Sequence, residues 1–88
     1  MLAFIRERQS DVLAEAIDSL TTSTHDDLPQ VIHAAYGTVG SYRLDAAHAA
    51  ISDLAAIVSD PQSTGADIEA ARVVTVDALR RIGDELTP

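Results

Sequence analysis

Apolar residues recur every three or four positions along most of this chain, and this spacing limits what it can fold into. The third of four such segments shows the pattern most regularly, with apolar residues at Leu44, Ala47, Ile51, Leu54 and Val58. That spacing places the side chains on one face of a helix. The β-branched run "RVVTV" sits inside a segment with the same helical period. The sequence therefore predicts helices and no strand.

The other three segments repeat the pattern. Their apolar positions are Leu2, Ile5, Val12, Leu13, Ala16, Ile17 and Leu20, with Gln9 as an interruption; then Leu28, Val31 or Ile32, Ala35 and Val39; and finally Ile68, Ala71, Val76, Leu79, Ile82 and Leu86. Short connections separate the segments, and "SDPQSTG" is one of them, with Pro61 and Gly65 as breaking residues. Four helices joined in this way predict an all-α fold, an antiparallel up-and-down four-helix bundle that forms a single domain over residues 1–88.

The stretch "HDDLPQ" marks the start of the second helix. Asp27 is a candidate N-cap, and Gln30 three residues later would complete a capping box. Pro29 is tolerated in the first turn, where backbone N–H groups have no helical partner. We expect this helix to run from about Leu28 to about Gly40.

The charge balance excludes several classes of partner. The chain has 14 acidic and 6 basic residues, a net charge of −8, and no cysteine. Binding to nucleic acid depends on basic residues that neutralise phosphates, so neither nucleic acid nor an anionic membrane surface is an expected partner. The longest apolar run, "LAAIV", is far too short to span a bilayer, and charges at 6–8 interrupt any signal peptide. A cytoplasmic location is expected.

One histidine in the second helix is followed by two glycines. His33, Gly37 and Gly40 are spaced i, i+4 and i+7, which places them one above another on the same face. Each glycine costs the helix about 1 kcal/mol relative to alanine. We expect an exposed imidazole beside a bare strip of backbone that another protein can approach closely. The alternative is close packing between helices, which would turn both glycines and His33 toward the core.

The residues from His33 to Leu44 read HAAYGTVGSYRL. This segment resembles the histidine-containing phosphotransfer (HPt) domain of bacterial phosphorelays, in which a four-helix bundle presents a histidine. The histidine, the glycines at +4 and +7, the small hydroxyl residue at +5, the aromatic at +9 and the apolar residue at +11 all match.

Two positions depart from the family pattern. Tyr36 stands where many members have lysine, and Arg43 stands where many have glycine in the turn between helices. Because arginine in a left-handed turn costs about 1 kcal/mol or more, we expect a turn of another kind.

The resemblance implies a phosphoryl carrier that is not itself an enzyme. A neutral imidazole is a nucleophile near pH 7, so His33 would attack the aspartyl phosphate of a response-regulator receiver domain. The second ring nitrogen would carry the proton, held by a group that the sequence does not identify. The receiver would supply Mg²⁺, so no cofactor is expected in this chain. The residues assigned to docking are Ala34, Tyr36, Gly37, Gly40 and Ser41, and those assigned to phosphoryl contact are Tyr36, Thr38 and Arg43. A histidine kinase is a second candidate partner.

The other two histidines are given structural interpretations. His48 lies near the core edge of the third helix, and His25 is expected to be a solvated residue of a connection. Their spacing fits no metal site, and no serine or cysteine nucleophile has an evident base. A different function also fits: an HPt-like bundle that binds a partner, or a second copy of itself, without being phosphorylated. Both a monomer and a homodimer are compatible with the sequence.

Overall fold

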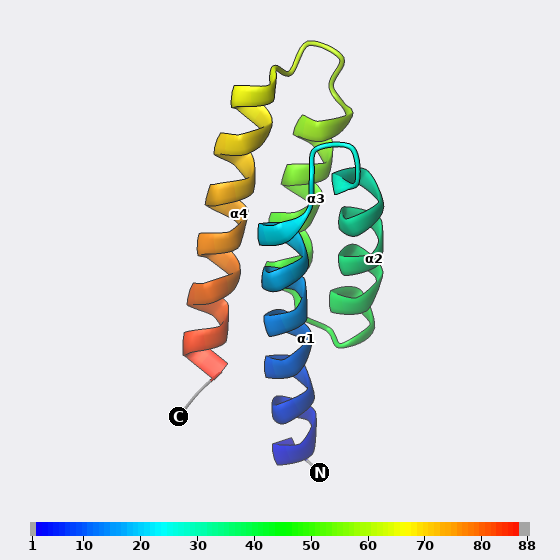
Figure 1. Ribbon diagram of the computed structural model, residues 1–88. Helices are drawn as coiled ribbons and strands as arrows, with labels where there is room; N and C mark the ends of the chain where they lie inside the picture. The colour runs from blue at the N-terminus through cyan, green and yellow to red at the C-terminus, as the bar shows by residue number, and fades with distance from the viewer. Residues whose placement is uncertain (1, 87–88) are drawn as a thin grey trace.

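The computed structural model describes the backbone of residues 2–86 and the side chains of residues 8–86. Four helices run up, down, up and down: α1 (Leu2–Thr22), α2 (Leu28–Ser41), α3 (Asp45–Ser59) and α4 (Gly65–Leu86) (Figure 1). No strand occurs within residues 2–86. The predicted all-α four-helix bundle is confirmed. The side chains of Leu2 and Ile5, which were predicted to face the core, lie outside the described side chains.

Each helix packs against two of the others. The contacting pairs are α1 with α2, α2 with α3, α3 with α4, and α4 with α1, so that α2 and α4 lie diagonally opposite. With 21 and 22 residues, α1 and α4 are longer than α2 and α3, which have 14 and 15. In Figure 1 the N-terminal part of α1 accordingly extends past the end of α2. The α2 helix therefore has one side against α1, one against α3, and the rest open to solvent.

The core consists of the predicted apolar stripes. Within residues 8–86, every buried apolar side chain occupies a position that the helical spacing assigns to the inside: Val12, Leu13, Ala16, Leu20, Leu28, Ile32, Ala35, Val39, Leu44, Ala47, Ile51, Leu54, Val76 and Leu79. Complete burial of a leucine or isoleucine side chain contributes about 1.5–3 kcal/mol. This cluster, rather than helix propensity, holds the four helices together.

The start of α2 differs from the prediction. Asp27 precedes the helix with φ −86° and ψ −17°, and its side chain makes no capping hydrogen bond, so the predicted capping box with Gln30 is wrong. Side-chain capping requires an extended N-cap residue, whereas Asp27 already has helical dihedral angles. The first backbone N–H of the helix finds its acceptor one turn earlier instead: Leu28 N–H donates to Thr24 O at 2.9 Å.

The end of α2 forms a Schellman motif. The Leu44 N–H donates to Val39 O at 3.0 Å and the Arg43 N–H donates to Gly40 O at 3.1 Å, which is the pair of bonds that defines the motif. Arg43 lies in the left-handed region with φ 58°, so the expectation of another kind of turn is wrong. Leu44 and Val39 are the positions whose apolar contact accompanies this motif, and both are buried. Their burial offsets the cost of a left-handed arginine.

Two hydrogen bonds from side chains fix helix ends across the bundle. Gln9, which interrupts the apolar stripe of α1, donates from Nε2 to Tyr42 O at 2.9 Å and so holds the end of α2. At the other end of the bundle, Arg72 of α4 donates from Nη1 to Ser23 O, just past the end of α1. Both bonds satisfy carbonyls that a helix end leaves without a partner.

Among the helices of residues 2–86, none has a stretch long and apolar enough to cross a membrane.

Candidate functional site

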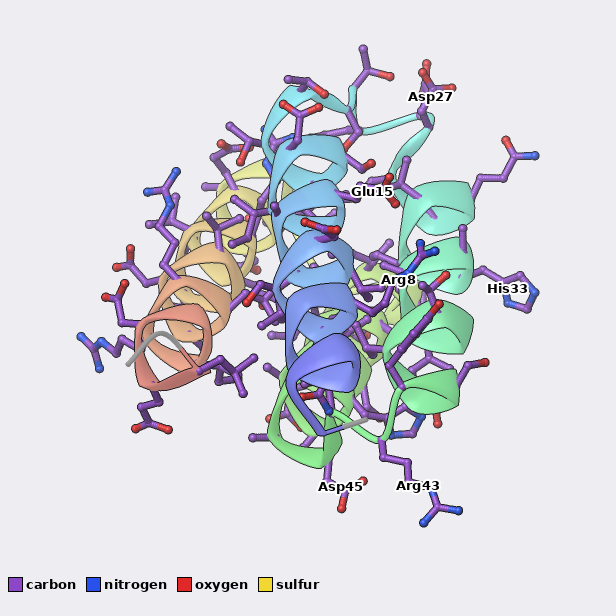
Figure 2. All side chains as sticks on the ribbon, turned by 90° about the horizontal axis from the view of Figure 1, so that it is seen from below. Arg8, Glu15, Asp27, His33, Arg43 and Asp45 are labelled. Atoms are coloured by element: carbon purple, nitrogen blue, oxygen red, sulfur yellow. The ribbon has the colours of Figure 1, made fainter. Side chains whose placement is uncertain are left out.

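His33 lies on the open face of α2. Its side chain is exposed and points outward, away from the other helices (Figure 2). In the part of the chain that the structure describes, His33 makes no hydrogen bond and no ion pair. Among residues 8–86, no hydrogen bond to the ring fixes the tautomer of His33, so the group that the sequence left unidentified is not found there. The whole of α2 also lacks Asp, Glu, Lys and Arg, in a chain of net charge −8.

A shallow hollow between α2 and α3 begins at the imidazole. Its volume is about 310 Å³, and α2 contributes His33 and Tyr36 while α3 contributes residues such as Ala55 and Val58. The remaining lining residues are Pro29, Ile32, Ser52 and Ser59. None of them is charged. The surface next to His33 is therefore small, apolar and neutral.

The two glycines serve different purposes. A Cβ atom built on Gly37 would have no atom within 4 Å, apart from its own helix backbone, so this position is open as predicted. A Cβ on Gly40 would lie 3.3 Å from Cδ2 of His48, so this position is occupied by a neighbouring ring. The predicted bare strip is thus only one glycine long. Close packing accounts for Gly40, but His33 does not turn inward as that alternative required.

The ring that fills the space over Gly40 also packs on Tyr36. The centroids of the Tyr36 and His48 rings are 3.8 Å apart, with the planes at 35°. His48 is partly buried, whereas Tyr36 remains 39% exposed. The structural interpretation of His48 therefore agrees with the geometry. The sequence did hold a signal for this pairing, since Tyr36 and His48 lie at similar distances on either side of the α2–α3 turn.

Not all of the predicted site residues come together. The hydroxyl of Thr38 donates to Ala34 O at 2.9 Å, and the hydroxyl of Ser41 donates to Gly37 O at 3.0 Å. Thr38 and Ala34 line a different hollow, between α1 and α2. Arg43 lies ten residues beyond His33, which corresponds to about 15 Å along a helix axis. Its side chain extends from the end of the bundle and not toward the imidazole (Figure 2).

His25 is part of a group that the sequence did not predict. Its Nε2 lies 3.0 Å from Oε2 of Glu69, and the same carboxylate accepts from the Arg72 guanidinium. We call His25, Glu69 and Arg72 the polar cluster. The hydrogen bond from His25, followed by that from Arg72, lowers the pKa of Glu69 below its ordinary value. His25 is thus a partnered residue and not simply a solvated one. His25 and Glu69 are 44 positions apart in the chain, so no local pattern indicates their contact.

Metal binding receives no support within the described residues, where no group of three His, Cys, Asp or Glu side chains could hold an ion. What α2 presents to solvent is the imidazole of His33, which has no hydrogen bond or ion pair within residues 8–86, beside the open space at Gly37. Comparisons with protein-family models, curated proteins and solved structures found no match to the chain.

Proposed function

We propose that this protein is a phosphoryl carrier of the HPt type, in which His33 exchanges a phosphoryl group with the receiver domain of a response regulator. The observation that carries the proposal is the exposed imidazole of His33, without a partner in residues 8–86, beside the open space at Gly37. A carrier histidine has to enter the active site of another protein, so it must project from its helix with no neighbour in the way. Such a relay would operate in the bacterial cytoplasm.

The transfer needs little from this chain. One ring nitrogen of His33 forms a bond to phosphorus while the bond from phosphorus to the aspartate oxygen breaks, and the carboxylate leaves as the anion. The other ring nitrogen keeps its proton, so the product is a phosphorylated imidazole. The receiver's Mg²⁺ provides the main electrostatic stabilisation of the transferring group. The neutral surface of α2 suits a transfer in which the receiver supplies the positive charge, because α2 places no carboxylate beside the phosphoryl group.

The turn after α2 adds support. Arg43 adopts φ 58° at the position where HPt domains often have glycine. A glycine takes this conformation at no steric cost, so the backbone has the shape that a glycine would favour even though the residue differs. The departure at Arg43 thus changes the side chain and not the course of the chain.

The departure at Tyr36 concerns the chemistry. Its ring is held against His48 with the side chain still partly exposed at the edge of the hollow. A phenol can donate one hydrogen bond to a phosphoryl oxygen, but it does not carry the charge of a lysine. Tyr36 is therefore the residue of this chain that we assign to contact with the phosphoryl group or with the docked receiver. Thr38 and Arg43 have no such role in the proposal, because of where they lie.

The proposal is tested by phosphoryl transfer from a panel of phosphorylated receiver domains. We expect label on the wild-type protein that is labile in acid and stable in alkali, and no label on His33→Gln. His25→Gln is the matched control, since it removes another imidazole eight residues away and should leave labelling intact. Absence of label from every receiver, or equal labelling of His33→Gln, would contradict the proposal.

A second function is favoured by the neutral hollow beside His33. Its lining includes Ile32, Tyr36, Ala55 and Val58, which suit an apolar partner surface whether or not phosphate is transferred. In that case a receiver domain binds without labelling His33, and Ala55→Glu abolishes binding while His33→Gln does not. Binding and labelling measured on the same panel separate the two functions.

A further inference from the structure

Two neighbouring valines of α4 leave more than half of their surface open to solvent. Val73 is 55% exposed and Val74 is 68% exposed, and in residues 8–86 the only other large apolar side chain classed as exposed is Tyr36. Beside Val74 a hollow of about 480 Å³ runs between α3 and α4, with Leu54 and Ile57 in its wall. Burying exposed valines of this kind is favourable because it removes apolar surface from water. This face is therefore a candidate contact surface.

Charged residues are placed symmetrically about Val74. Asp67 precedes it by seven residues and Arg81 follows it by seven, and all three side chains are exposed. A seven-residue step is close to two helical turns, about 10.5 Å, so the three residues form one stripe along the helix. The stripe has an acidic end, an apolar centre and a basic end. It is complementary to itself when one copy is reversed.

We propose that α4 is a homodimer interface, in which a second copy of this chain packs antiparallel with Val74 at the two-fold axis. Asp67 of each copy then faces Arg81 of the other, which gives two equivalent ion pairs on either side of the valines. A parallel arrangement would instead place Asp67 against Asp67 and Arg81 against Arg81. The charges thus select the antiparallel pairing.

The acidic surroundings favour this partner. Asp53 and Asp67 both line the hollow beside Val74, so an incoming group should be apolar and basic. In the antiparallel pairing a reversed copy of α4 brings Val74 and Arg81 to this hollow. Asp77 lies on the same face and approaches its own copy, which weakens the contact. An interface limited to one helix face is small, and we expect a dissociation constant on the order of 10–100 μM.

The dimer leaves the site on α2 open. Helices α2 and α4 make no contact in the described part of the bundle, and His33 points away from α4 in Figure 2. Dimerisation is therefore independent of the proposed function, and its test does not require a receiver domain.

Sedimentation equilibrium of the full chain between about 10 μM and 1 mM tests the proposal. We expect the wild type to move from monomer to dimer across this range, and Arg81→Glu to stay monomeric because it places two pairs of carboxylates together. Arg81→Lys should retain the dimer. Arg80→Glu is the matched control, because it makes the same charge change one residue away. Arg80 lines a separate hollow between α1 and α4, together with Ser10 and Leu13. A wild type that is monomeric throughout, or equal effects of Arg80→Glu and Arg81→Glu, would overturn the proposal.

Disulfide trapping fixes the orientation, since the chain has no cysteine of its own. Val74→Cys should form an intermolecular disulfide under mild oxidation, because the two residues meet at the axis. Arg81→Cys should not, because its copies would lie about 21 Å apart along the helices, and a disulfide needs Cα atoms about 4–7 Å apart. Rapid cross-linking of Arg81→Cys, or none of Val74→Cys, would rule out the antiparallel pairing.

Discussion

The histidine of the polar cluster, His25, has a hydrogen-bond partner, whereas the exposed histidine of α2, His33, has none within residues 8–86. His25 is bonded to Glu69, which is bonded to Arg72, and Arg72 reaches the carbonyl of Ser23. His33 is only eight residues further along, yet it projects from a helix without a single charged residue. The first arrangement ties the connection after α1 to α4. The second leaves the His33 imidazole without a hydrogen bond or ion pair to any residue whose side chain the structure describes.

The two histidines differ in whether a basic residue lies nearby. Arg72 is one of 6 basic residues and is largely buried, with 15% of its side chain exposed. It satisfies backbone groups that would otherwise lack partners at the end of a helix. No basic residue is placed on α2, where it would have to be desolvated when a partner docks. Arg72 thus joins α4 to the end of α1, whereas α2 carries no Asp, Glu, Lys or Arg.

Removal of Arg72 should have the largest effect on stability. Arg72→Ala leaves the carbonyls of Leu20 and Ser23 without this donor, and we expect a loss of about 1–3 kcal/mol in the free energy of unfolding. Urea unfolding followed by circular dichroism measures it. The control is Arg80→Ala, an exposed arginine on the same helix, for which we expect a change within about 0.5 kcal/mol. If the two variants are equally stable, the polar cluster does not hold the connection.

The turn after α2 should gain stability when its arginine is replaced by glycine. Because Arg43 has φ 58°, Arg43→Gly removes a steric cost of about 1 kcal/mol or more. Arg43→Ala keeps that cost while it removes the charge, so it should show no comparable gain. Thermal unfolding of the three proteins separates the backbone effect from the effect of charge. An equal gain in Arg43→Ala would mean that the charge, and not the conformation, is unfavourable.

The glycine pair offers a sharper test of the α2 face. Gly37→Ala meets nothing within 4 Å and should gain nearly the full helix propensity of alanine, about 1 kcal/mol. Gly40→Ala brings its Cβ to 3.3 Å from His48 and should gain less. In a His48→Ala background the difference between the two should disappear, which a double-mutant cycle measures.

The same glycine variants bear on function. If the open space at Gly37 admits a receiver domain, Gly37→Ala should slow labelling of His33 although it makes the protein more stable. Gly40→Ala should change labelling less, because His48 already covers that position. Unchanged labelling in a stabilised Gly37→Ala would show that docking does not use this space.

The sequence predicts the four helices and the core because both follow from short-range periodicity. It places His33 on an exposed face for the same reason. It misses contacts that depend on how helices pair, such as His48 over Gly40 and the polar cluster. It also assigns the wrong cap at Asp27, since the dihedral angles of that residue depend on the turn before it. The sequence misses the left-handed turn at Arg43 for another reason. Burial of Leu44 and Val39 outweighs the steric preference of a non-glycine residue for negative φ.

The pH dependence of the polar cluster should be the smallest effect. The His25 and Arg72 hydrogen bonds lower the pKa of Glu69 in the folded protein below the ordinary value of 4.5. A carboxyl whose pKa is lower when folded stabilises the protein above its unfolded pKa, and the stabilisation is lost as the pH falls through the folded pKa. The wild type should therefore be more stable than Glu69→Gln at pH 6, with a difference that shrinks below about pH 4.5. Because Glu69 is exposed, solvent screening keeps this difference small. Glu85→Gln is the control for the loss of an exposed carboxyl charge on α4, because Glu85 has no hydrogen bond or ion pair to another side chain in the described structure. A difference that stayed constant from pH 6 to pH 3 would mean that Glu69 acts through packing and not through its charge.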